Sequence, residues 1–140
     1  MNTIRRLLSS TRGAAAIEFA IVAPLFLLVV LTLIAYGIYL SAAHALQQLT
    51  ADAARTAVAG ISEQERVTLV NNYIAVSTLN DPLIDRKKLQ VTVATDPQNS
   101  NQFTVTTEYD ARALPIWNLY TFPLPSTTIR RFATIRMGGI

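Results

Sequence analysis

Cysteine is absent from this sequence of 140 residues, and histidine occurs once, at position 44. A chain without cysteine forms no disulfides and has no thiol chemistry. A single histidine without cysteine also leaves no ligand set for a structural zinc site. Glycine-rich loops that bind phosphate groups are missing as well, so nucleotide binding has no support. We therefore expect no metal and no cofactor.

The sequence also lacks a nucleophile and base in a catalytic setting. His44 has Ser41 three residues before it and Asp52 two turns after it. Catalysis needs a base that a third group orients within a pocket, which a single exposed helix does not provide. We interpret His44 as a histidine on a helix surface, and we expect that the protein is not an enzyme.

Charged residues are scarce, at 15% of the chain against about 25% in soluble proteins. The first 13 positions contain no acidic residue but hold Arg5, Arg6 and Arg12. Three of the twelve basic residues lie there, which leaves nine basic against nine acidic residues in the remainder. The net charge of +3 therefore belongs to the N-terminal segment. This distribution is a membrane-topology signal rather than a nucleic-acid footprint, so no nucleic-acid partner is expected.

A long apolar run follows this basic segment. No charged residue occurs from Phe19 to Leu40. A helix over this run is about 33 Å long, which matches the hydrocarbon core of a bilayer at about 30 Å. A secretory signal peptide usually has a shorter apolar stretch, about 7–15 residues, so we interpret the run as a spanning helix that contacts membrane lipid. The arginines before it predict a single-pass protein of the bacterial inner membrane, with its N-terminus in the cytoplasm and its C-terminal domain in the periplasm.

The helical pattern continues beyond the apolar run. Small and apolar residues recur at steps of three and four, as on one helix face: Ala42, Ala45, Leu46, Leu49, Ala53 and Ala57. Gly60 is a plausible stop, which predicts one helix over 14–59. Ser62 and Glu65 have the spacing of a capping box. The apolar spacing after them predicts a second helix over 63–78.

In the remaining third of the chain, apolar and polar residues alternate as they do in β-strands. Alternation over 89–93 and again over 103–109, with the turn-forming residues 96–101 between them, predicts a hairpin. Three prolines make 114–126 an irregular loop, and residues of one parity over 129–137 predict a last strand. The predicted fold class is α+β: a long N-terminal transmembrane helix continuing outside the membrane, then a second helix and a small antiparallel sheet of about three strands.

The most informative stretch runs from Gly13 to Pro24. Glu18 lies five residues after Gly13, small residues follow the glycine, and Phe19 comes directly after Glu18. Taken alone, Glu18 is explained by the helix dipole, which favours an acid in the first turns. The whole stretch resembles the prepilin processing site of type IV-type pilins, in the variant of tight-adherence (Flp) pili, and the opening of TadE-like minor pseudopilins. Phe19 stands where the major pilin usually has Tyr, which favours a minor component.

The resemblance implies a processing site. Residues 1–13 would be a prepilin-type leader, 14–59 the transmembrane and extended N-terminal helix, and 60–140 the periplasmic α+β domain. A prepilin peptidase would cut between Gly13 and Ala14, because glycine leaves the extended backbone unobstructed.

The resemblance also implies assembly with other subunits. Glu18 would pair with the Ala14 amine of a neighbour, so that two costly charges in an apolar setting compensate each other. Phe19 and Pro24 would be further assembly or recognition residues. The implied partners are the prepilin peptidase, other pilins or pseudopilins, and inner-membrane pilus assembly proteins.

Alternatives remain for the protein as a whole and for two of its segments. The chain is alternatively an unprocessed, signal-anchored periplasmic binding module of an envelope or secretion complex, and the mature N-terminus separates the two. The basic cluster Arg86–Lys88 reads as a solvated turn rather than a lipid or DNA site. Trp117, Tyr120 and Phe122 either pack onto the sheet, form a partner-binding patch, or rest at the membrane interface.

Overall fold

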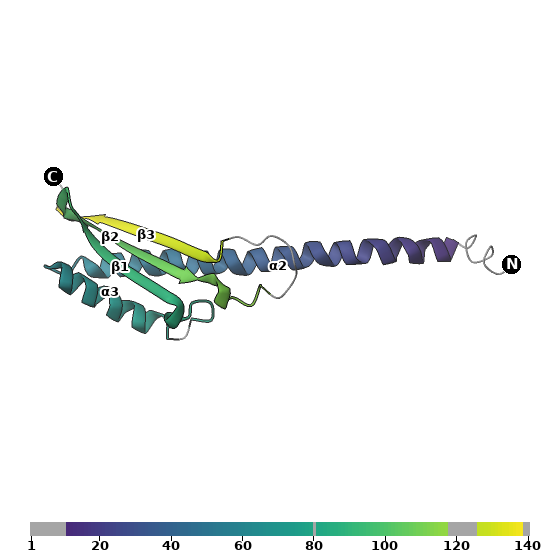
Figure 1. The fold of residues 1–140 in the computed structure, drawn as a ribbon, viewed down its shortest axis with the longest axis horizontal. Coiled ribbons are helices and arrows are strands. Elements are labelled where there is room, and N and C mark those ends of the chain that lie inside the picture. The colour runs from purple at the N-terminus through teal and green to yellow at the C-terminus, as the bar shows by residue number, and fades with distance from the viewer. Residues whose placement is uncertain (1–10, 80, 118–125, 139–140) are drawn as a thin grey trace.

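A computed structural model describes residues 11–79, 81–117 and 126–138. Figure 1 shows a long helix whose N-terminal half projects from a small domain. The elements are α2 (Thr11–Ala57), α3 (Glu63–Ser77), β1 (Leu89–Asp96), β2 (Asn99–Asp110) and β3 (Thr128–Arg136), with short 3-10 helices η1 (Arg86–Lys88) and η2 (Ala111–Ala113). The α+β class predicted from the sequence is confirmed.

Helix α2 ends two residues before the predicted boundary, at Ala57. The amide of Val58 donates to the carbonyl of Arg55 at 3.2 Å, and Gly60 donates to Ala57 at 3.0 Å. Such bonds across three residues tighten the last turn and end the α-helix. Within the described residues the helix already begins at Thr11, ahead of the predicted start at residue 14.

The second helix begins as its sequence predicted. The Ser62 hydroxyl accepts a hydrogen bond from the Glu65 amide at 3.2 Å, and the Glu65 carboxylate accepts one from the Ser62 amide at 3.4 Å. This reciprocal pair is the predicted capping box. At the other end, the Thr78 amide still donates to the Ile74 carbonyl, so the helix closes one residue before the predicted limit.

The strands form an antiparallel sheet in the order β1-β2-β3. Val93 lies opposite Val105, and Val105 lies opposite Ala133. The predicted hairpin is tight, because the Asp96 carboxylate accepts the Gln98 amide at 2.8 Å and turns the chain. The last strand ends at Arg136, after which the Met137 amide donates to the Asn101 carbonyl at 2.6 Å.

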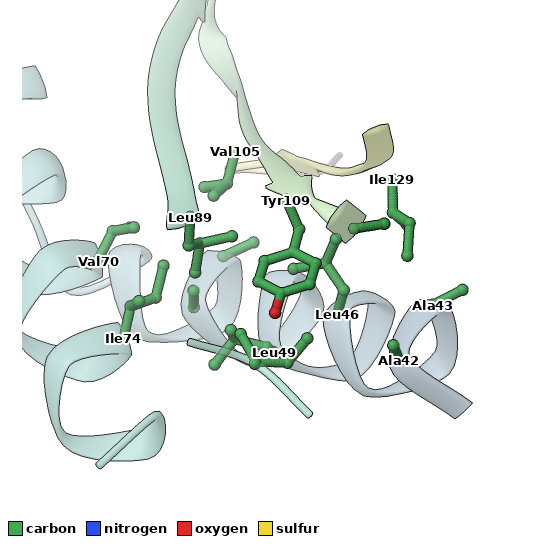
Figure 2. Packing of buried hydrophobic residues seen from close by; sticks show 14 of the residues in the cluster. Ala42, Ala43, Leu46, Leu49, Val70, Ile74, Leu89, Val105, Tyr109 and Ile129 are labelled. Atoms are coloured by element: carbon green, nitrogen blue, oxygen red, sulfur yellow. The ribbon is translucent and has the colours of Figure 1, made fainter. Parts of the chain in front are cut away.

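The core lies between one face of the sheet and the two helices (Figure 2). Alternate residues of β2 are buried, namely Phe103, Val105, Thr107 and Tyr109. The face of α2 predicted from the sequence meets them, since its members are buried except for the half-buried Ala45. Burying each large apolar side chain contributes about 1.5–3 kcal/mol, so the outer half of α2 is part of the domain rather than a stalk.

Two polar contacts cross this core. The hydroxyls of Thr50 on α2 and Thr107 on β2 are buried and 2.5 Å apart, and the Thr50 hydroxyl also lies 2.6 Å from the Leu46 carbonyl. Arg66 on α3 is buried too. Its Nε donates to the Gly60 carbonyl at 3.2 Å, and its guanidinium lies 5.0 Å from the Phe103 ring centroid, a cation–π distance.

Candidate processing and assembly site

The predicted site residues all lie on the projecting half of α2. No residue from Ala14 to Ile34 is buried, whereas Ala35 is 0% exposed and begins the core. Many of the side chains along this half are large and apolar, and an exposed apolar surface of this extent requires an apolar environment or partner. Among the described residues, α2 is the helix long and apolar enough to cross a membrane. The structure is therefore compatible with single-pass anchoring.

Gly13 and Ala14 lie within the first turns of α2. Gly13 is half-buried and Ala14 is exposed. A peptidase needs an extended backbone, so the helix must open locally before the bond between them can be cut. Glycine makes that opening easier, because a helix is about 1 kcal/mol less stable with glycine than with alanine at the same position. The end of a helix is also where its hydrogen bonds fray most readily.

Glu18 is exposed on the same helix face as Ala14, four residues earlier. The two positions are about 6 Å apart along the helix axis. A carboxylate within an apolar, lipid-facing surface is costly, by about 2.5–3.5 kcal/mol near the bilayer centre, unless it has a partner. Glu18 thus presents an acid on a surface that is otherwise suited to lipid or to another helix.

Phe19 and Pro24 flank this acid on the exposed surface. Phe19 is 73% exposed, and Pro24 is exposed inside the helix. Proline has no amide hydrogen, so the carbonyl of Ala20 loses its usual donor. Helix α2 nevertheless continues through this position, and the site stays on one uninterrupted element.

The other residues singled out in the sequence lie on the domain. His44 is exposed, and the Asp52 carboxylate pairs with Arg55, so the interpretation of His44 as a surface histidine is confirmed. Arg86–Lys88 forms η1, a turn with Lys87 and Lys88 exposed. Trp117 packs against the core, whereas Tyr120 and Phe122 lie outside the described residues.

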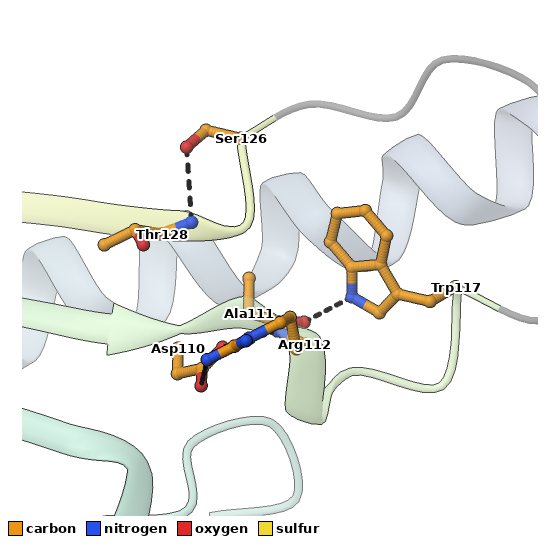
Figure 3. Close-up of polar contacts among 6 residues, drawn as sticks. All are labelled: Asp110, Ala111, Arg112, Trp117, Ser126 and Thr128. Atoms are coloured by element: carbon orange, nitrogen blue, oxygen red, sulfur yellow. Dashed lines mark hydrogen bonds and ion pairs between the residues drawn. The ribbon is translucent and has the colours of Figure 1, made fainter.

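The end of the domain nearer the projecting half of α2, here the proximal end, is formed by η1, η2 and Leu114–Trp117 (Figure 1). Figure 3 shows the Trp117 indole donating to the Ala111 carbonyl at 2.6 Å, and Arg112 pairing with Asp110 at 2.8 Å. The hydrogen bonds from Arg112 lower the pKa of Asp110 to about 2. These two contacts join close neighbours in sequence, whereas the Ala111 amide donates to the Thr127 carbonyl at 2.8 Å and so ties the proximal end to the start of β3.

A pocket of about 600 Å³ opens between the end of α3, Leu79, residues 81–87 and η2. Tyr109 lines it and accepts a hydrogen bond from the Asp85 amide at 3.4 Å. Burial raises the pKa of the Tyr109 hydroxyl. Sequence reasoning missed this pocket, because its walls come from separate segments and share no motif. The described residues contain no group of three or more His, Cys, Asp or Glu side chains that could hold a metal ion.

These features define a class of protein: an α+β domain built onto the outer half of one long helix, whose other half suits a membrane. Residues 13–55 match the model of the TadE-like protein family, which confirms the resemblance predicted from the sequence. The match covers nearly all of α2 and stops before α3. It implies involvement in tight-adherence pilus systems, and association with pilus assembly components in general. No significant match was found among curated proteins or among solved structures.

Proposed function

We propose that this chain is a minor pseudopilin of a tight-adherence (Flp) pilus, processed by a prepilin peptidase and lacking enzymatic activity of its own. The proposal rests on the exposure of Glu18 on the apolar, projecting half of α2. The family match, which begins at Gly13, supports it. The proposed orientation puts the N-terminus in the cytoplasm and the domain in the periplasm, because the arginines precede the span.

Cleavage after Gly13 would create a positive amine on Ala14. When two such helices pack side by side, Glu18 of one subunit meets the Ala14 amine of the other. The axial separation of these positions then offsets neighbouring subunits by about 6 Å, four residues of helix. Pairing of the two charges compensates their transfer into an apolar setting. The pair would therefore select one register between subunits.

Processing is tested by the mature N-terminus. In cells with the dedicated peptidase, we expect the protein to begin at Ala14, as read by intact-mass and N-terminal analysis after membrane extraction. Gly13→Leu should retain the leader, because a bulky side chain obstructs the scissile backbone. Gly37→Leu, an exposed glycine in the same helix, is the control and should be processed normally. Wild-type protein that keeps Met1 in piliated cells would refute processing.

Orientation is tested by reporter fusions after Ile140. A reporter active only in the periplasm should be active, and a reporter active only in the cytoplasm should be silent. The arginines near the N-terminus resist translocation, which is the physical reason for this expectation. The opposite pattern would overturn the assignment of compartments without affecting the fold.

A second candidate is an unprocessed, signal-anchored periplasmic binding module. Two observations favour it: α2 is already helical at Gly13, which disfavours cutting there, and the domain carries the pocket beside Tyr109. The N-terminal analysis above separates the candidates, because this one predicts an intact leader in piliated wild-type cells.

A further inference from the structure

The domain begins inside the apolar run rather than after it. The run without charge extends to Leu40, yet Ala35 is fully buried, and Ile38 and Tyr39 pack against the same core cluster. That cluster also contains Leu114 and Ile116, with Trp117 packed against it. If the whole run is embedded, the proximal end lies at the level of the outer leaflet and not above it.

The residues at this level suit a bilayer interface. Tyr36 and Tyr39 lie in the last turns of the apolar run, and Trp117 is half-buried with its indole nitrogen bonded to a carbonyl. Tyrosine and tryptophan are enriched where a membrane meets water, because one end of each ring is apolar and the other polar. Trp117 is the chain's single tryptophan.

Exposed cations accompany these aromatic residues. Lys87 and Lys88, the two lysines of the chain, are exposed on η1, and neither forms an ion pair within the part of the chain that the structure describes. The acids of this end are engaged locally. Asp81 and Asp85 accept backbone amides, and Asp110 pairs with Arg112. Asp85 lies beside Lys87, and Lys88 acts on the Asp110 carboxyl, but neither acid forms an ion pair with a lysine among the described residues. This end carries four basic residues, Arg86, Lys87, Lys88 and Arg112, against three acidic ones, Asp81, Asp85 and Asp110, so a positive charge remains in excess.

We propose that the proximal end is a lipid-binding surface that sits in the outer headgroup layer, with Trp117 at its apolar boundary. Lys87 and Lys88 would then face anionic phospholipid headgroups, in place of the solvated turn that the sequence alone favoured. The docked domain would fix the direction in which α2 leaves the membrane. This inference rests on membrane anchoring by α2, and not on pilus assembly.

The depth of Trp117 is the first test. The full chain is reconstituted in vesicles of equimolar phosphatidylcholine and phosphatidylglycerol, and flotation shows separately that it is anchored. Lipids brominated near the headgroup end of the acyl chain should quench Trp117 fluorescence, and aqueous acrylamide should quench it less than in detergent. An anchored protein quenched by acrylamide alone would place the domain clear of the bilayer and overturn the inference, while leaving the anchor intact.

Headgroup preference is the second test. Energy transfer from Trp117 to dansyl-labelled phosphatidylglycerol should exceed transfer to dansyl-labelled phosphatidylcholine, because each lysine near an anionic surface is worth about a fivefold preference. Lys87→Gln/Lys88→Gln should remove the excess, and high salt should weaken it. Arg55→Gln/Arg136→Gln removes two exposed charges farther from this end and should preserve it. Equal transfer to both lipids, or equal loss in both variants, would refute the site.

Discussion

Gly60 sits where the chain turns from α2 toward α3, and it is buried. A Cβ atom built there would lie 2.8 Å from Arg66 Cγ and 2.9 Å from the Arg66 amide nitrogen. The second contact is with backbone, which cannot rotate away. At this position the absence of a side chain is what allows the two helices to approach.

Gly60→Ala should lower the free energy of unfolding by about 1–3 kcal/mol, the usual cost of overpacking. Denaturant unfolding of the full chain in detergent, followed by Trp117 fluorescence, measures the change. Gly37→Ala is the matched control, because a Cβ at Gly37 meets nothing within 4 Å. Equal midpoints for Gly60→Ala and wild type would show that the turn relaxes without cost.

Between elements, the hydroxyls of Thr50 and Thr107 join α2 to the middle of the sheet. The Thr50 hydroxyl has one proton, and the Leu46 carbonyl beside it is an acceptor only. Thr50 therefore donates to Leu46, and Thr107 donates to Thr50. Because of this direction of donation, removing one hydroxyl leaves a buried donor without an acceptor, whereas removing the other does not.

Thr50→Val should lower the free energy of unfolding by about 1–3 kcal/mol, because it leaves the buried Thr107 hydroxyl without its acceptor. Thr107→Val should cost less, since Thr50 keeps its bond to Leu46. The same denaturant unfolding compares the two variants, which have the same change in shape. Equal losses, or a larger loss for Thr107→Val, would contradict this donor assignment.

At the scale of the whole molecule, the two halves of α2 have different surroundings. The outer half is covered by the sheet and α3, whereas the half from Ala14 to Ile34 has no buried residue. This exposed half contains Glu18, whose proposed partner belongs to another subunit. Its role is therefore tested in the assembled state rather than in the isolated chain.

Glu18→Gln keeps the side-chain shape but removes its charge. Insertion should be spared, because a neutral amide is no harder to place in lipid than a carboxylate. Cutting after Gly13 should also be spared. Assembly should fail, since loss of one member of a buried ion pair costs about 3–5 kcal/mol. Pili should be lost or reduced, as seen by electron microscopy, while processed protein accumulates in the membrane.

Two results would count against this role of Glu18. Normal piliation of Glu18→Gln cells, with normal crosslinking to partner subunits, would mean that the helix dipole alone explains the acid at this position. Unprocessed protein would instead make Glu18 a residue that the peptidase recognises. Glu108→Gln, a change of the same kind on the sheet surface where Glu108 pairs with Arg130, should leave both processing and piliation unchanged.

The sequence by itself determined the parts that depend on local pattern. The uncharged run predicted the long apolar helix, the three- and four-residue steps predicted which face of its outer half is buried, and Ser62 with Glu65 predicted the start of α3. The alternation on either side of 96–101 predicted the hairpin. The stretch from Gly13 to Pro24 likewise carried the family resemblance, because its residues lie within a few turns of one another.

Tertiary structure alone decided what depends on distant residues. Thr50 and Thr107 meet across 57 positions, and Arg66 reaches Phe103 from another element. The burial of Ala35 inside an apolar run is equally invisible in the sequence, because an alanine that faces lipid and one that faces protein occupy the same pattern. The proximal end depends on such contacts, since packing against the sheet and the segment at Leu114–Trp117 determines where the exposed part of α2 ends.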